Sequence, residues 1–125
     1  MNRTLRLLAV FVLAAAVLAS PAHGRTTATD ASAVMLAELP MEARAVDAAI
    51  RKGGPFRYER DGVAFGNFEK LLPVKPRGYY HEYTVPTPGS KNRGARRIVC
   101  GGPKTAPAAC YYSDDHYQSF RRIRE

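Results

Sequence analysis

The sequence lacks most of what a protein needs to hold a metal ion. Its 125 residues include only two cysteines, Cys100 and Cys110, and three histidines, whereas a structural zinc site needs four such ligands. Acidic residues are also in the minority, with 11 Asp and Glu against 19 Lys and Arg. They form no cluster suited to a hard cation. We therefore expect no metal and no other cofactor.

The sequence has no apolar run long enough to form a transmembrane helix. Residues 7–19 are apolar but fall short of the roughly 20 residues that a helix needs to cross a bilayer. Basic residues precede this run and a small-residue segment follows it, which is the order found in a secretory signal peptide. We predict that residues 1–24 are removed, by cleavage after Ala22 or Gly24, and that the protein is secreted to the periplasm or the medium. A retained membrane anchor is the alternative.

Secretion would place the two cysteines in an oxidising compartment, where disulfides form. Cys100 and Cys110 lie at facing ends of two consecutive predicted strands, so a disulfide there would close the loop of residues 101–109. Two separate buried thiols are the alternative.

The order of secondary structure predicts an α+β domain over residues 38–125. Residues 25–37 are rich in Ala, Thr and Ser and predict a flexible N-terminal arm. Apolar residues at helical spacing predict a helix over 41–52, with Met41, Ala45, Val46, Ala49 and Ile50 on its buried face. The β-rich runs that follow are 78–85, 96–101, 110–112 and, as a fourth candidate, 117–123. Their short connections favour a twisted antiparallel sheet with the N-terminal helix packed on it.

Strand alternation separates two neighbours in the 78–85 run. Side chains alternate between the faces of a strand, so His81 shares the mostly aromatic face that we expect in the core. Glu82 then points to the opposite, open face. Outside the predicted signal peptide the only other histidine is His116, which makes it the candidate partner for Glu82.

The basic residues near Glu82 indicate an anionic substrate. A formal net charge of +8 attracts polyanions. Arg93 lies in a predicted loop, and strand alternation allows only one of Arg96 and Arg97 to share the face of Glu82 without deciding which. A proton acceptor, a proton donor and guanidinium groups that grip phosphate oxygens suit metal-free cleavage of a phosphodiester. The alternatives are a structural ion pair for Glu82, an exposed turn residue for the histidine and solvated surface charges for the arginines.

Three segments resemble the microbial guanyl-specific, barnase-like ribonucleases. They are residues 79–85, 93–98 and 115–117. Residues 54–56, 61–63 and 67–69 match earlier segments of that family, and the resemblance covers roughly residues 38–123 in order. It implies the microbial ribonuclease fold and cleavage of single-stranded RNA on the 3′ side of guanosine through a 2′,3′-cyclic phosphate.

The resemblance also implies roles for individual residues. Glu82 corresponds to the general base that takes the proton of the ribose 2′-hydroxyl. His116 corresponds to the general acid that protonates the departing 5′-oxygen. Arg97 and Arg93 correspond to the arginines that bind the scissile phosphate, which favours Arg97 over Arg96.

Base recognition is expected in residues 65–69. Glu69 resembles the glutamate whose carboxylate accepts from N1–H and the N2 amino group of guanine. The further contacts implied for the base or phosphate come from Phe65, Asn67, Phe68 and Tyr117, with Asn67 and the loop backbone facing O6 and N7. Phe68 stands where bacterial members commonly have arginine, and Gly66 replaces a bulkier polar residue. The alternative is an ordinary turn with Phe68 packed inward.

The expected partners follow from the same resemblance. They are guanine-containing single-stranded RNA and a small acidic inhibitor protein that covers the basic cleft, and we expect a monomer. Two rival functions are a non-catalytic cationic RNA-binding protein and a membrane-active cationic protein. The second would need an exposed basic amphipathic helix, whereas residues 41–52 carry acidic residues as well as basic ones.

Overall fold

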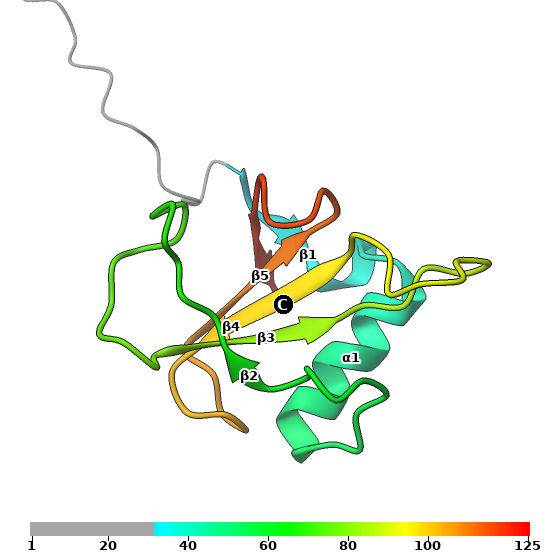
Figure 1. Ribbon diagram of the computed structural model, residues 1–125, viewed down its shortest axis with the longest axis horizontal. Helices are drawn as coiled ribbons and strands as arrows, with labels where there is room; N and C mark the ends of the chain where they lie inside the picture. Colours follow the sequence, from blue (N-terminus) through cyan, green and yellow to red (C-terminus); the bar gives the residue numbers. More distant parts are fainter. Residues whose placement is uncertain (1–31) are drawn as a thin grey trace, which may run out of the picture.

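Helix α1 (Met41–Lys52) and six short strands form the regular structure of residues 32–125, the part of the chain that the computed structural model describes (Figure 1). The strands are β1 (Val34–Met35), β2 (Val63–Ala64), β3 (Tyr80–Thr84), β4 (Arg97–Gly101), β5 (Ala109–Ser113) and β6 (Arg121–Arg124), and the 3-10 turn η2 (Leu36–Glu38) precedes the helix. They form a sheet in the order β1-β6-β5-β4-β3-β2. This is the expected α+β fold. The predicted signal peptide, 1–24, and residues 25–31 of the predicted arm lie outside the described residues.

Helix α1 ends where its sequence predicts, and its buried face agrees with the prediction only in part: Ile50 is buried and Val46 packs against the core, whereas Ala45 is exposed. Gly53 adopts a left-handed conformation with φ 82°, and its N–H donates to the carbonyl of Ile50 while the next N–H donates to that of Ala49, as in a glycine-terminated helix. The buried residues are Ala43, Asp47 and Ile50. Met41, expected on this face, is 69% exposed. Within residues 32–125, no helix has the length and apolar content to cross a bilayer.

The sheet is antiparallel except at one edge. Strands β2 to β6 pair antiparallel in sequence order, whereas β1 pairs parallel to β6, with Val34 beside Ile123. Residues 34–37 were predicted to belong to a flexible arm, yet Val34 is buried and packs into the core. A two-residue strand is too short to show a period in the sequence, so only the pairing with β6 reveals it.

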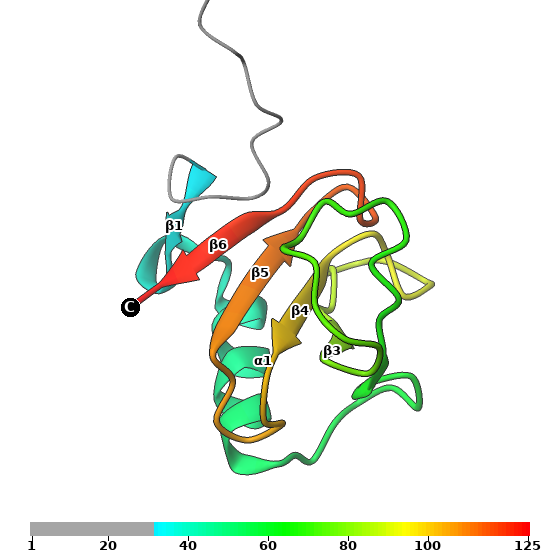
Figure 2. The same cartoon turned by 90° about the vertical axis from the view of Figure 1, so that its left-hand side faces the viewer.

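Each face of the sheet carries a hydrophobic cluster. The first lies between α1 and the sheet and includes Tyr83, Ile98 and Tyr112; Figure 2 shows α1 behind β4 and β5. The second lies on the opposite face, where Leu72, from the long connection between β2 and β3, packs with Tyr80, among others. The face that we expected to be open is therefore half covered, which leaves a bounded cleft rather than a flat surface.

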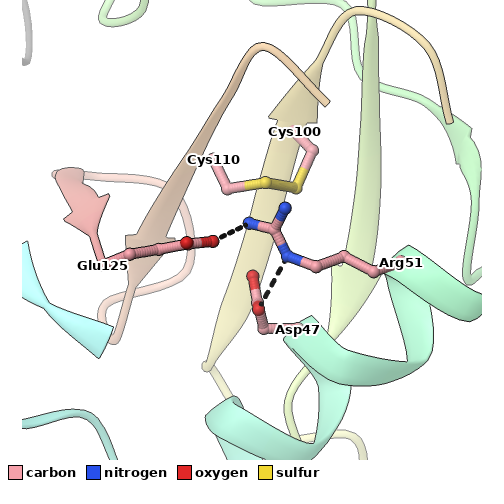
Figure 3. Close-up of a disulfide and its surroundings, with 5 residues drawn as sticks. All are labelled: Asp47, Arg51, Cys100, Cys110 and Glu125. Atoms are coloured by element: carbon pink, nitrogen blue, oxygen red, sulfur yellow. Dashed lines mark hydrogen bonds and ion pairs between the residues drawn. A yellow bond between two sulfur atoms is a disulfide. The ribbon is translucent and has the colours of Figure 1, made fainter. Parts of the chain in front are cut away.

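The predicted disulfide is present between Cys100 and Cys110, which are directly opposed on β4 and β5. Both sulfurs lie on the helix side of the sheet, near a small polar cluster (Figure 3). There Arg51 donates to Asp47 at 3.2 Å and forms an ion pair with Glu125 at 3.0 Å. The disulfide joins two central strands on the face opposite the predicted site.

Candidate active site

Glu82 lies at the centre of β3 on the face turned away from α1. Its cross-strand neighbours are Val63 on β2 and Val99 on β4, and it is only 7% exposed. The guanidinium of Arg60 approaches its carboxylate at 3.6 Å from the connection before β2. His81 pairs with Cys100 on the helix side, so the two neighbours lie on opposite faces as strand alternation predicts.

The register of β3 and β4 decides between the two adjacent arginines. Arg97 pairs with Thr84, two residues from Glu82 on the same face. Directly opposed residues in an antiparallel pair point to the same side. Arg97 therefore faces the site and Arg96 does not, in agreement with the family resemblance.

Arg97 is buried and is held by neutral oxygens. It is 2% exposed, and its guanidinium donates to the carbonyls of Gly94 at 3.0 Å and Arg96 at 2.8 Å and to the hydroxyl of Tyr117 at 3.0 Å. Among the described residues it forms no ion pair with an acidic side chain. A buried guanidinium without a carboxylate partner keeps its charge for an external anion.

Arg93 joins the same site from the loop before β4. Its guanidinium donates twice to the hydroxyl of Thr84, at 3.1 and 2.6 Å, and lies 6.0 Å from the ring centre of Tyr58. Because Thr84 is also the cross-strand partner of Arg97, the two guanidiniums converge on the end of β3. Thr84 shares the face of Glu82 by simple alternation, so this supporting residue could have been found in the sequence.

His116 is presented by the turn between β5 and β6. It and Tyr117 both have positive φ angles, 55° and 69°, a backbone conformation uncommon outside glycine that often marks functional sites. The N–H of His116 donates to Ala95 at 3.0 Å, which ties this turn to the arginine loop. The hydroxyl of Ser113 accepts from the N–H of Tyr117 and bonds the carboxylate of Asp115. The sequence pattern indicates the histidine, but these supporting contacts carry no signal in it.

Tyr117 connects the turn that carries His116 to Arg97 and to the loop of residues 65–69. Burial raises the pKa of its hydroxyl, the negative charge of Glu82 raises it further, and the hydrogen bond from Arg97 opposes both. The ring of Tyr117 stacks on Phe65 with 5.3 Å between centroids. A neutral tyrosine thus lies between the arginine, the glutamate and the loop expected to read the base.

The loop of residues 65–69 borders this centre. With His116 and Tyr117 it lines a cavity of about 240 Å³ to which Glu69 also contributes. The expected recognition loop and the expected acid therefore share one cavity. On the other side of His116, a more open cavity of about 570 Å³ includes Arg93.

Two residues of this loop differ in their placement from simple expectation. The amide of Asn67 is engaged with the backbone of Leu72, donating at 3.0 Å and accepting at 3.1 Å, so its side chain holds the loop. Phe68 is 93% exposed, which contradicts the inward-packed alternative. Its ring lies so close to Gly66 that a Cβ there would be 2.4 Å from it. The absence of a side chain at Gly66 therefore leaves the space that the ring of Phe68 occupies.

The donor set in the described part of the chain does not resemble a metal centre. Between residues 32 and 125 no three His, Cys, Asp or Glu side chains are grouped so that they could hold a metal ion.

Comparison with known proteins places these residues in a family context. A family model described as ribonuclease matches residues 22–124. Guanyl-specific ribonuclease Sa3 of Kitasatospora aureofaciens is 52% identical over 90 residues, covering 72% of this chain and 62% of that protein. Guanyl-specific ribonuclease St of Saccharopolyspora erythraea is 50% identical over 88 residues, covering 70% of this chain and 83% of that protein.

Solved structures agree with this match. A structure of ribonuclease Sa2 in complexes with mononucleotides superimposes with a TM-score of 0.70 at 48% identity, covering 75% of this chain and 94% of that one. Another, of ribonuclease Sa2 with guanosine-2′-cyclophosphate, gives a TM-score of 0.68 at 47% identity, covering 74% of this chain and 95% of that one.

Proposed function

This chain belongs to the microbial guanyl-specific ribonuclease family, and on that premise we propose that it is a secreted, metal-independent endoribonuclease. It cleaves single-stranded RNA on the 3′ side of guanosine. The observation that carries the proposal is the buried Arg97, which has no acidic partner among the described residues, lies on the face of Glu82 and is hydrogen-bonded to the turn of His116.

The first step is a transesterification. Glu82 takes the proton of the ribose 2′-hydroxyl, whose oxygen attacks phosphorus as the bond from phosphorus to the 5′-oxygen breaks. His116 gives its proton to that departing oxygen. Arg97 and Arg93 hold the non-bridging phosphate oxygens as negative charge grows on them, and their fixed positions avoid the cost of reorganisation.

The second step opens the 2′,3′-cyclic phosphate. Water attacks phosphorus, the imidazole of His116 removes a proton from that water, and Glu82 returns its proton to the 2′-oxygen. The acid and the base thus exchange roles, as microscopic reversibility requires. After the two steps Glu82 is again ionised and His116 is again protonated, and no metal ion takes part. A substrate without a 2′-hydroxyl cannot enter the first step, so DNA is not cleaved.

Guanine selection rests on the cavity beside His116. Glu69 accepts hydrogen bonds from N1–H and N2 of guanine, a pair of donors that adenine, cytosine and uracil do not offer. Because the amide of Asn67 is engaged with the backbone of Leu72, we assign the contacts to O6 and N7 to the loop backbone. Phe65 and the exposed ring of Phe68 supply stacking surfaces.

A panel of four dinucleoside phosphates tests this proposal. With EDTA present, guanylyl-3′,5′-cytidine should release guanosine 2′,3′-cyclic phosphate, and the adenosine, uridine and cytidine analogues should react far more slowly. A non-catalytic RNA-binding protein would release none from any of them. Loss of the activity in EDTA, with recovery on adding a divalent cation, would contradict metal independence.

Export, oligomeric state and inhibition are parts of the same proposal. The leader-like order of residues 1–24 supports secretion, and mass spectrometry of the protein recovered from its producing cells would show whether cleavage follows Ala22 or Gly24. The basic cleft supports binding by a small acidic inhibitor protein, and we propose that the enzyme acts as a monomer.

A further inference from the structure

A third cavity lies on the far side of residues 65–68 from the cavity that holds Glu69 and His116. It has a volume of about 650 Å³, within the range of small-molecule sites. Phe65, Asn67 and Phe68 line both this cavity and the one that holds Glu69 and His116. The two cavities are therefore adjacent and share one wall.

The lining of this cavity combines positive charge with exposed apolar surface. Lys70, Lys75 and Arg77 line it, and its lining contains no acidic residue. These three cations are exposed, and within residues 32–125 none of them forms an ion pair. Two of the exposed large hydrophobic residues, Phe68 and Val74, line the same cavity.

The segment that carries these cations, residues 70–77, is held in place by hydrogen bonds. The amide of Asn67 is paired with the backbone of Leu72, and the hydroxyl of Tyr80 donates to the carbonyl of Pro73 at 2.5 Å. The ammonium of Lys75 lies 5.4 Å from the ring centre of Tyr79. Because these hydrogen bonds anchor the segment at Leu72 and Pro73, it is organised before a ligand binds, which reduces the free-energy cost of binding.

We propose that this cavity, lined by Lys75 and Arg77 and bounded by Phe68, binds the nucleotide on the 5′ side of the guanosine, with its phosphate on the cations and its base on the exposed ring. Cationic grooves with aromatic stacking surfaces are the usual means of holding single-stranded RNA. This inference rests on the proposed function, since it takes the guanosine to lie in the cavity beside His116.

The direction of the bound RNA follows from the order of the three cavities. The cavity of Glu69 and His116 lies between the other two, since it shares lining residues of the 65–68 segment with one and His116 with the other. The scissile phosphate is 3′ of guanosine and lies by His116, Arg93 and Arg97. The open cavity that contains Arg93 and His116 then takes the nucleotide after the cleaved bond. The cavity on the far side of the 65–68 wall remains for the preceding nucleotide.

Three substrates test this assignment. They are GpC, the 5′-extended UpUpGpC and the 3′-extended GpCpUpU, with kcat/KM measured for each. We expect the 5′ extension to raise kcat/KM over GpC by about tenfold. The double variant Lys75→Gln/Arg77→Gln should lose this gain and keep the GpC and GpCpUpU rates within about twofold of wild type. The matched control Arg44→Gln/Lys52→Gln removes the same charge from exposed positions on α1, across the sheet, and should keep the gain.

Salt dependence supplies a second readout. A phosphate held by Lys75 and Arg77 should steepen the fall of log(kcat/KM) with log[salt] for UpUpGpC by about 0.7, and the double variant should lose that increment. The proposal is overturned if wild type cleaves UpUpGpC no faster than GpC, if the 5′ gain persists in Lys75→Gln/Arg77→Gln, if the control loses it equally, or if the double variant slows GpCpUpU instead. If wild type does not cleave GpC, the proposed function fails separately. The cavity is then tested by binding of fluorescent UpUpG to the same variants, and equal affinities would overturn it.

Discussion

Arg97 donates a hydrogen bond from Nε to the hydroxyl oxygen of Tyr117 across 3.0 Å. The bond connects the buried guanidinium on β4 to the turn that presents His116. It fixes the orientation of the guanidinium that we propose holds the phosphate. Arg97 and the neighbour of His116, the proposed general acid, are therefore coupled through the Tyr117 hydroxyl.

Removal of that hydroxyl should slow the reaction more than it weakens substrate binding. In Tyr117→Phe the Nε–H of Arg97 loses its partner, and hydrogen bonds to charged groups contribute about 1.5–3 kcal/mol. We expect kcat to fall about 10- to 100-fold with KM changed less. Steady-state kinetics on GpC, with Tyr79→Phe as control and thermal unfolding of both variants, checks this. An unchanged kcat would show that the bond does not orient the arginine.

Substitution of Glu69 should relax base preference and leave the cleavage chemistry in place. Glu69→Gln removes one hydrogen-bond acceptor for guanine, and sites built around such bonds discriminate strongly against bases that lack the donors. The ratio of kcat/KM for GpC to that for ApC should fall at least about 100-fold. The exposed Glu59 supplies the control Glu59→Gln, which should keep the ratio. Unchanged selectivity in Glu69→Gln would remove this residue from base recognition.

Asp115 should stabilise the His116 turn in a pH-dependent way. Burial acts to raise the pKa of its carboxyl, but hydrogen bonds from Ser119 and Ser113 outweigh burial and lower the pKa. A lowered folded-state pKa stabilises the protein at pH values above the unfolded-state pKa, and the effect disappears as the pH falls through the folded-state pKa.

The variant Asp115→Asn should therefore be less stable than wild type at pH 7, by no more than about 1 kcal/mol since the site is only partly buried. The gap should close in strong acid. Urea unfolding from pH 2 to 7 measures it, with the exposed Asp114→Asn as control. A gap that is constant with pH would mean that the ionised carboxylate contributes nothing.

Loss of the disulfide should reduce stability without removing activity. The bond between Cys100 and Cys110 closes a short loop, which contributes about 2.5–3 kcal/mol in the chain-entropy model. It lies on the helix side of the sheet, away from Glu82. Urea unfolding of Cys100→Ala/Cys110→Ala should show that loss, and kcat on GpC below the melting transition should match wild type. Equal stability of the two proteins would contradict the loop-closure argument.

Strong periodic patterns in the sequence predicted the helix, the central strands and the placement of Glu82. The alternation of β3 separated Glu82 from His81 because a strand turns neighbouring side chains to opposite faces. The choice of Arg97 over Arg96 needed the register with Thr84. Register depends on pairing between distant segments, which a single strand does not encode.

The supports of the site come from contacts that no local pattern carries. Arg60 reaches Glu82 from the connection before β2, and the carbonyl of Ala95, in the loop before β4, accepts from the N–H of His116. The buried face of α1 includes Asp47 because Arg51 is one turn away to pair with it. Hydrophobic spacing alone selected Met41 instead, which tertiary packing leaves exposed.

The decisive assay measures release of guanosine 2′,3′-cyclic phosphate from GpC, in EDTA and across pH, by wild type, Glu82→Ala and His116→Ala. Wild type should release it with a bell-shaped pH dependence, since one group must act ionised and the other protonated. Each variant should be slower by about 10²- to 10⁴-fold. Wild-type protein that binds GpC but releases no cyclic product would show that Glu82 and His116 do not form a catalytic pair, and so would variants that match the wild-type rate.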